Sequence, residues 1–233
     1  MEKKYVSSIK INDFSSKGTV SRVLSRKTGR IHHLLSTLER NVFTLLDFDE
    51  NIMDIKEHFE LEDVREIVDD NIDWSKFKDK KTGLEYKITT TFLVTFINGK
   101  KIAISCKNST ELYRSNTQLL LEIQRRYWTV KAIPWGIVTN KDIPEVKLKN
   151  IKWLLNGSDT YEDKQLQEII GNTLLNSKGR LKDYINFVSS TYGYKEEVIL
   201  KTIKCMIVGG ELKINLGEEI SLRSELSKFS GKG

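Results

Sequence analysis

The chain has 233 residues, of which 39% are hydrophobic and 30% are charged, and its formal net charge is +6. This composition is typical of a globular protein with one large domain or two modest ones. No apolar run approaches the roughly 18–20 residues of a membrane span, and the first residues, MEKKYVSSIK, lack the apolar core of a signal peptide. We therefore expect a cytoplasmic protein without a membrane partner.

The two cysteines, Cys106 and Cys205, lie far apart within apolar patterns. We interpret them as reduced core residues, as expected in the cytosol. The sequence has no Cys-x-x-Cys motif, and its histidines do not have the spacing of zinc ligands. The sequence therefore does not predict a zinc site.

Positive charge is concentrated at the N-terminus. Residues 1–30 hold eight Lys or Arg side chains against two acidic ones, whereas residues 158–233 hold eleven of each kind. A basic arm on a neutral body suggests a polyanionic partner such as DNA. The alternative is a solvated terminus with no partner.

Leucine and valine at helical spacing predict an amphipathic helix at about residues 36–46. Ser36 and Glu39 have the spacing of a capping box, in which the glutamate caps the first turn. Glu39 also lies at the edge of the buried stripe, where it could face the sheet that the helix covers. A strand at about residues 52–59 follows, and then a long connection, residues 60–83, with one short helix.

Residues 87–107 predict two strands joined at an Asn-Gly turn, which is a strong hairpin signal. A two-residue loop would pair Phe92 with Ser105. A three-residue loop with Gly99 in a left-handed bulge would pair Phe92 with Ile104 and gather the apolar side chains on one face. Because a one-residue slip exchanges the two faces, the apolar pattern favours the bulged loop.

In this register Lys107 is expected on a polar face with Thr89, Thr91 and Ser105. A helix at about residues 110–130 and a strand at about residues 133–139 come next. A strand after a helix of this length is most simply parallel to the strand that ends at Lys107.

A further helix at about residues 144–155 ends in Asn-Gly, a good C-cap, and we place a domain boundary in SDTYEDK, just after it. Helices at about residues 161–175, 181–192 and 195–208 then precede two short strands around Gly217. Three helices and a β-hairpin predict a winged-helix-like domain. Because its acidic and basic side chains are equal in number, the domain is as compatible with docking to a protein as with binding to DNA.

Glu39 and Lys107 together suggest metal-dependent cleavage of a phosphodiester. Metal-dependent cleavage of a phosphodiester needs a divalent ion, carboxylates that hold it and a lysine near the developing charge. A glutamate on a helix that faces a hairpin, with an acid on one strand and a lysine on the next, is the layout of PD-(D/E)xK nucleases. The spacing alone is a weak signal, because isolated glutamates and lysines are common.

Longer motifs carry a family resemblance. KTGRIHHLLSTLER, FDENIMDIKEHFEL, TTTFLV, IAISCK and EIQRRYWTVKAIPWGIVT resemble the TnsA family, the endonuclease subunits of heteromeric cut-and-paste transposases. The resemblance spans about residues 20–156, and the C-terminal part resembles the family only in layout. It implies an α/β nuclease domain in residues 31–157, a restriction-endonuclease-like mixed sheet flanked by helices, between a basic arm in residues 1–30 and a winged-helix-like domain in residues 158–233.

The same resemblance implies an activity and partners. The family cuts the 5′ ends of the transposon during DNA transposition. The implied partners are the DNA of the transposon ends, a TnsB-type transposase that cuts and joins the 3′ ends, and a TnsC-type ATPase that contacts the C-terminal domain. The implied location is the bacterial cytoplasm, in association with the nucleoid while the protein is on DNA.

The resemblance also implies site residues. The catalytic positions are Glu39, Lys107 and Thr91, and the cofactor is Mg²⁺, with Mn²⁺ as an alternative. The implied metal ligands are Glu39, Thr91, Ser105 and the backbone carbonyl of Cys106. However, Thr91 stands where the family has its metal-binding aspartate, and a threonine hydroxyl is a poor substitute for a carboxylate on a hard cation.

Three interpretations of Thr91 are open. The chain is a natural or engineered inactive subunit that keeps its role in the assembly, another carboxylate such as Glu85 replaces the missing one, or the match to the family is shifted by one residue. Weak residual cleavage accounts for the remaining cases. The function is therefore either that of a 5′-end endonuclease or that of an architectural or regulatory subunit that links the transposase–DNA complex to the ATPase.

DNA contacts are expected from the KTGR segment and its surroundings. The candidates are Arg26, Lys27, Arg30, His32 and His33. Packing is the alternative role for the two histidines.

Overall fold

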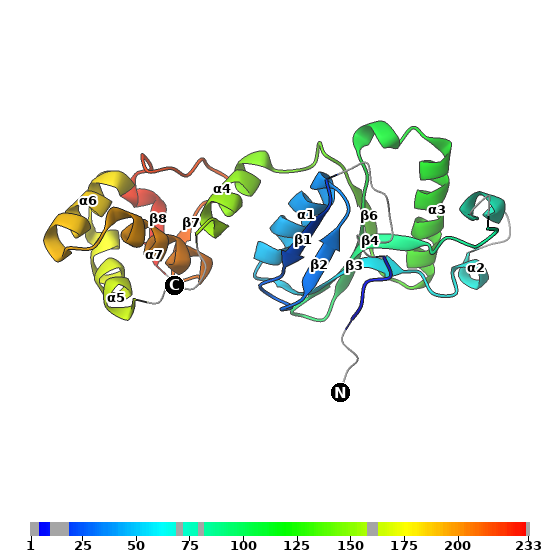
Figure 1. The fold of residues 1–233 in the computed structure, drawn as a ribbon, viewed down its shortest axis with the longest axis horizontal. Helices are drawn as coiled ribbons and strands as arrows, with labels where there is room; N and C mark the ends of the chain where they lie inside the picture. The colour runs from blue at the N-terminus through cyan, green and yellow to red at the C-terminus, as the bar shows by residue number, and fades with distance from the viewer. Residues whose placement is uncertain (1–4, 10–18, 69–71, 79–81, 158–162, 232–233) are drawn as a thin grey trace. The chain divides into compact units, whose positions relative to one another are not determined.

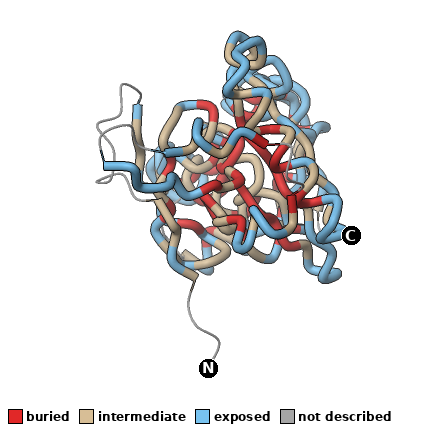
Figure 2. The backbone as a smooth tube through the Cα atoms, turned by 90° about the vertical axis from the view of Figure 1, so that its right-hand side faces the viewer, coloured by how far each residue is buried: buried red, intermediate tan, exposed pale blue. Residues whose placement is uncertain are grey.

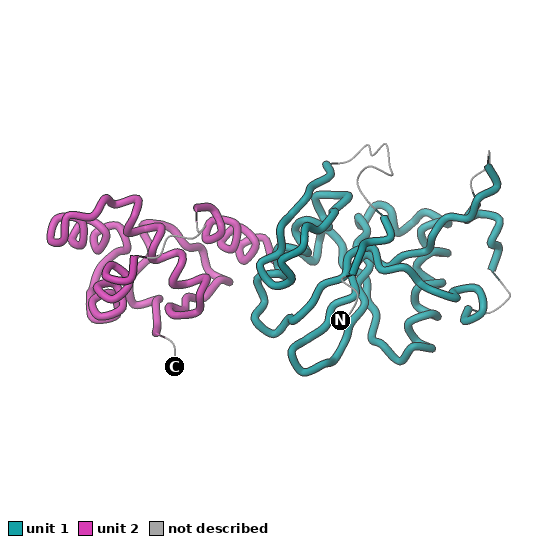
Figure 3. Tube along the Cα trace, turned by 60° about the horizontal axis from the view of Figure 1, so that its bottom comes forward, with its two compact units in different colours: residues 1–143 teal, residues 144–233 magenta. Residues whose placement is uncertain are grey.

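The computed structural model describes residues 5–9, 19–68, 72–78, 82–157 and 163–231. It divides into two compact units, residues 1–143 and residues 144–233 (Figure 3). Four lysines of the predicted basic arm, at positions 3, 4, 10 and 17, and most of the predicted interdomain boundary lie outside the described residues. No helix among the described residues is long and apolar enough to cross a membrane.

The first unit is a mixed sheet with a helix on each face (Figure 1). Its four strands lie in the order β3-β4-β5-β6, with β3, β4 and β5 antiparallel and β6 parallel to β5. A separate two-stranded sheet, β1-β2, precedes it in the chain. The elements of this unit are β1 (Ser21–Leu24), β2 (Ile31–Leu34), α1 (Thr37–Phe48), β3 (Ile52–Glu60), α2 (Val64–Ile67), η2 (Trp74–Phe77), β4 (Thr89–Phe96), β5 (Lys101–Cys106), η3 (Ser109–Glu111), α3 (Ser115–Val130) and β6 (Trp135–Val138).

The central hairpin has the register that the apolar pattern favours. Phe92 pairs with Ile104 and Val94 with Ile102. Gly99 has φ +79°, a left-handed conformation that glycine adopts without strain, and its N–H donates to Phe96 O over 2.9 Å. The predicted three-residue loop is therefore confirmed, and so is the predicted parallel strand after α3.

Two apolar clusters hold the helices to the sheet. On one face, α1 packs Val42 and Phe43 against Phe92 and other apolar side chains of the sheet. On the other face, α3 packs residues such as Ile123 and Trp128 around Leu93, which directly follows Phe92 in β4. Alternate residues of each strand thus serve opposite cores, and Figure 2 shows these buried stretches in the interior of the chain.

The second unit contains α4, three further helices and a small antiparallel sheet. Its elements are α4 (Glu145–Leu155), α5 (Lys164–Thr173), η4 (Leu174–Asn176), α6 (Leu181–Tyr192), α7 (Glu196–Val208), β7 (Leu212–Ile214), η5 (Leu226–Lys228) and β8 (Phe229–Gly231). The three predicted helices are present. The predicted hairpin around Gly217 is wrong, because β7 pairs with β8 and the residues after Gly217 form an irregular connection.

The unit boundary also differs from the predicted one, because α4 belongs to the C-terminal unit. The buried side chain of Asn150 donates to the carbonyls of Leu216 (2.8 Å) and Glu218 (2.6 Å) and accepts the N–H of Ile220 (3.1 Å). These bonds tie α4 to the connection between β7 and β8. The predicted arm is likewise shorter than expected, since residues 21–24 pair with β2 inside the first unit.

Asn150→Ala tests the role of α4 in the C-terminal unit. The substitution removes three hydrogen bonds and leaves the N–H of the buried residue Ile220 unpaired, so the free energy of unfolding should fall by about 2–4 kcal/mol. Urea unfolding followed by circular dichroism measures this change. Lys147→Ala, at an exposed position of the same helix, should change it by less than about 0.5 kcal/mol. Equal effects of the two substitutions would contradict this role.

Candidate active site

Glu39 is held at the start of α1, beside the sheet. The Ser36 hydroxyl accepts the Glu39 N–H over 3.1 Å, as predicted for a helix N-cap. The Glu39 carboxylate accepts the N–H of Leu35 over 2.7 Å, one residue before the position that a capping box requires. Its side chain is only 13% exposed. Glu39 therefore caps the helix and still presents a mostly buried carboxylate to its surroundings.

His58 is a neighbour of Glu39 that the sequence did not identify. Its Nε2 lies 3.6 Å from Glu39 Oε2 and 3.0 Å from the carbonyl oxygen of His33. Although it lies inside β3, its φ is +46°, which is uncommon for a residue other than glycine. The irregular backbone at His58 turns a buried imidazole toward the start of α1, and no local sequence pattern signals such a turn.

Thr91, Cys106 and Lys107 lie where the central hairpin ends. The Thr91 hydroxyl accepts the backbone N–H of Cys106 over 3.0 Å. Burial raises the pKa of the Cys106 thiol, the charge of Glu39 raises it further, and the charge of Lys107 opposes both. Thr91 is thus in contact with Cys106, and Glu39 and Lys107 lie close enough to Cys106 for their charges to act on its thiol.

Ser105 does not join this group. Its hydroxyl donates to Gln124 Oε1 over 2.6 Å and accepts the indole N–H of Trp135 over 2.9 Å, and the residue is fully buried. Gln124 belongs to α3, so Ser105 faces the α3 side, whereas Cys106 packs in the cluster on the α1 side. The expected polar face shared by Ser105 and Thr91 is therefore wrong, and Ser105 is poorly placed as a metal ligand.

The donors present fit a hard divalent cation poorly. Among the described residues, no group of three or more His, Cys, Asp and Glu side chains could hold a metal ion. Glu39 supplies one carboxylate, and Thr91 supplies a neutral hydroxyl that already accepts a hydrogen bond. Glu85, the proposed substitute, pairs with Arg65 over 2.8 Å and with Lys78. The site therefore lacks the second carboxylate that Mg²⁺ coordination favours.

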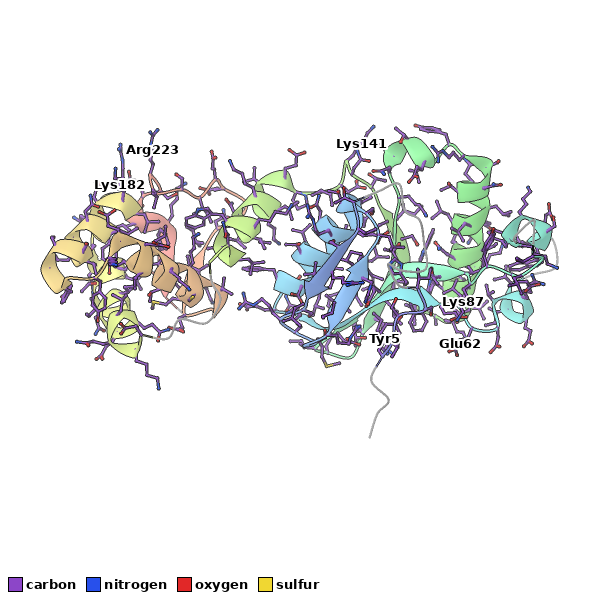
Figure 4. The ribbon with its side chains drawn as sticks, in the orientation of Figure 1. Tyr5, Glu62, Lys87, Lys141, Lys182 and Arg223 are labelled. Carbon is purple, nitrogen blue, oxygen red and sulfur yellow. The ribbon has the colours of Figure 1, made fainter. Side chains whose placement is uncertain are left out.

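A second polar cluster lies under the β1–β2 hairpin. Glu57 is almost fully buried, with Arg30 Nη1 at 3.1 Å and His32 Nδ1 at 2.8 Å from its Oε2. His32 Nε2 lies 3.0 Å from the Thr28 hydroxyl. Arg30 also stacks on the ring of Tyr5, which is labelled in Figure 4. Arg30 and His32, predicted as DNA contacts, are thus used inside the protein.

The loop between β1 and β2 carries Arg26 and Lys27, two more of the predicted DNA contacts. The Ser25 hydroxyl donates to Asp47 Oδ1 over 2.6 Å and accepts the N–H groups of Lys27 and Thr28. The Arg26 N–H donates to Asp47 Oδ2 over 3.1 Å. Within this ordered loop the Arg26 side chain is exposed and that of Lys27 half-buried. His33 contributes its backbone carbonyl to His58.

Two comparisons show which known proteins this chain resembles. Residues 49–140 match a family model described as the N-terminal domain of TnsA-like endonucleases. The chain is also 33% identical, over 224 residues, to the transposon Tn7 transposition protein TnsA of Escherichia coli. That alignment covers 92% of this chain and 80% of the relative.

Glu57→Gln tests the buried cluster. Burial raises the pKa of Glu57, but the hydrogen bond and charge of His32, with further help from Arg30, leave this pKa below its usual value. A carboxyl whose folded-state pKa is lowered stabilises the fold above its unfolded-state pKa of about 4.3, and that contribution is lost as the pH falls. The variant should therefore lose about 3 kcal/mol at neutral pH, and the difference from wild type should shrink in acid.

Chemical denaturation at several pH values measures that difference. Glu50→Gln, at an exposed turn, is the control and should match wild type throughout. A pH-independent difference for Glu57→Gln would show that the charge of Glu57 is not what stabilises the fold.

Proposed function

The chain belongs to the TnsA family, and we propose that it acts at transposon ends as the TnsA-type subunit, with its 5′-end cleavage impaired by Thr91. The observation that carries the proposal is the Thr91–Cys106 hydrogen bond. A neutral hydroxyl occupies the position at which the family resemblance places a metal-binding aspartate. Glu39 at the start of α1 and Lys107 directly after β5 support the proposal, whereas Ser105 does not take part.

The impairment has an electrostatic cause. A carboxylate attracts a divalent cation through its charge, whereas a hydroxyl offers only a dipole. Glu39 cannot compensate, because Leu35 N–H and His58 already compete for its carboxylate oxygen. Mg²⁺ or Mn²⁺ is therefore expected to bind weakly to the natural chain and more tightly once an acid stands at position 91.

The same observation favours a second candidate function. A subunit that cuts poorly can still join the complex, because most residues of its two apolar cores lie outside the site. The same holds for the C-terminal unit and for the loop with Arg26 and Lys27, which we propose faces DNA and call the DNA-facing loop. In this case the chain is an architectural or regulatory subunit between a TnsB-type transposase on DNA and a TnsC-type ATPase. In the C-terminal unit, α5, α6 and α7 with the small sheet support the proposal of a winged-helix-like docking domain, to which α4 is added. Either function places the chain in the bacterial cytoplasm, on the nucleoid while it acts.

Thr91→Asp should restore cleavage. The new carboxylate lies beside Glu39 and Lys107, so nicking of a transposon-end duplex with the partner transposase and Mn²⁺ or Mg²⁺ should rise by about a hundredfold or more, equivalent to about 2.7 kcal/mol. Calorimetric titration with Mn²⁺ should show tighter binding by the variant in the absence of DNA.

Thr91→Asn is the matched control, since it has the shape of aspartate without the charge, and it should not gain activity. Thr91→Asp combined with Glu39→Ala should lose the gain. If wild type already cuts as fast as Thr91→Asp, Thr91 does not impair the site. If Thr91→Asp binds no metal and does not cut, the chain is the non-cleaving subunit.

Arg26→Ala with Lys27→Ala tests the DNA-facing loop. Each phosphate contact contributes about 0.9 to the slope of log affinity against log salt concentration, so the slope for duplex binding should fall by about two. Lys100→Ala with Lys101→Ala, at the exposed turn of the central hairpin, is a charge-matched control and should leave the slope unchanged. Similar slopes for the two double variants would contradict DNA contact by this loop.

A further inference from the structure

A hollow lies beside the end of β3, away from the residues discussed above. It has a volume of about 400 Å³, and Figure 4 labels two of its residues, Glu62 and Lys87. Its walls come from the turn after β3, from α2, from η2 and from the segment before β4. Its aromatic lining residues are Trp74, Phe77 and Tyr86.

The hollow combines an apolar base with aromatic walls. Leu61 and Ile88 are buried and belong to the cluster under α3. Trp74 and Phe77 stand partly exposed with their ring centroids 6.0 Å apart, and Tyr86 is 53% exposed. Large exposed aromatic side chains beside a hollow are typical of binding surfaces.

The charge of the hollow is negative, although the whole chain is positive. Five carboxylates face two cations in its lining. Two of the carboxylates are paired, Glu60 with Lys87 over 2.7 Å and Glu85 with Arg65 over 2.8 Å. Glu62, Asp63 and Glu66 are exposed and form no ion pair with any described residue. This surface repels phosphate and attracts cations.

An internal arginine shows which cation the hollow accommodates. The Arg65 guanidinium lies 5.0 Å from the centre of the Trp74 ring while it pairs with Glu85. A planar guanidinium suits this combination of an aromatic face and a carboxylate better than a compact ammonium group does. The unpaired carboxylates offer the same chemistry to a guanidinium from outside.

We infer that this hollow is a docking site for an arginine-bearing segment of a partner protein. The volume accommodates several side chains. Leu84, 69% exposed, and Tyr86 extend the apolar surface along the chain, as a peptide requires and a free amine does not. The inference does not depend on cleavage at the candidate active site, and it places a protein contact on a surface that does not suit DNA.

The probes are three fluorescent peptides of equal length, built on one Gly-Ser-Leu background and carrying arginine, lysine or glutamate. Fluorescence anisotropy with the full chain measures their affinities. The arginine peptide should bind in a saturable manner, the lysine peptide more weakly, and the glutamate peptide not at all. Absence of saturable binding by the arginine peptide, or equal affinity for the arginine and lysine peptides, would overturn the inference.

Glu62→Lys with Glu66→Lys locates the site. Reversing two exposed charges should weaken binding of the arginine peptide by about tenfold or more. Glu50→Lys with Glu168→Lys makes the same change in net charge at exposed positions outside the hollow, and it should leave the affinity near that of wild type. Equal losses in the two double variants would show that the peptide responds only to net charge and would overturn the assignment. Thermal unfolding verifies that both variants are folded.

Discussion

The register of the β4–β5 hairpin is the constraint on which the rest of the nuclease-like unit depends. The left-handed glycine in its turn shifts the pairing by one residue relative to a tight two-residue loop. In this register, Phe92 and Ile104 face α1 while Leu93 and Ala103 face α3. A slip of one residue would bury the wrong faces on both sides at once, so both helices depend on the same turn. The register also brings Thr91 to the N–H of Cys106, next to Lys107.

A second constraint joins the β1–β2 hairpin to the sheet. Two consecutive residues of β3 contact different parts of the chain. Glu57 binds Arg30 and His32. His58 contacts Glu39 and the carbonyl oxygen of His33. The positive φ at His58 lets both neighbouring side chains face inward, which an ordinary strand does not permit. The loop with Arg26 and Lys27 is thereby connected to the helix start that carries Glu39.

The proposed active site keeps a helix carboxylate and a strand-end lysine, Glu39 and Lys107, but it lacks a second carboxylate at position 91. Placement of a helix carboxylate and a strand-end lysine follows from the packing of α1 and the end of β5, so both persist when one ligand changes. Metal affinity depends instead on the number of carboxylates at one point. A single side chain at position 91 therefore alters the chemistry and leaves the fold intact. The acidic hollow beside β3 and the basic loop with Arg26 and Lys27 have opposite charge, which is consistent with our two proposals, a protein contact at the hollow and a DNA contact at the loop.

Local patterns in the sequence were sufficient for α1, the β4–β5 hairpin, α3 and β6 of the first unit, but they did not reveal the β1–β2 hairpin. Helical spacing placed α1 and α3, the Asn-Gly turn and the alternating apolar residues set the hairpin register, and the length of α3 implied the parallel β6. These features depend on neighbours in the chain, so periodicity reveals them. The family resemblance, rather than a local pattern, pointed to Glu39, Thr91 and Lys107 as site residues.

Other features were decided only by tertiary structure, because they depend on contacts between distant residues. The side chain of Asn150 draws α4 into the C-terminal unit, and β8 replaces the nearer segment as the partner of β7. Gln124 and Trp135 hold Ser105 on the α3 side, and Glu57 turns Arg30 inward. A sequence shows that a residue is polar or charged, but only the fold decides whether its partner is DNA, a metal or another buried side chain.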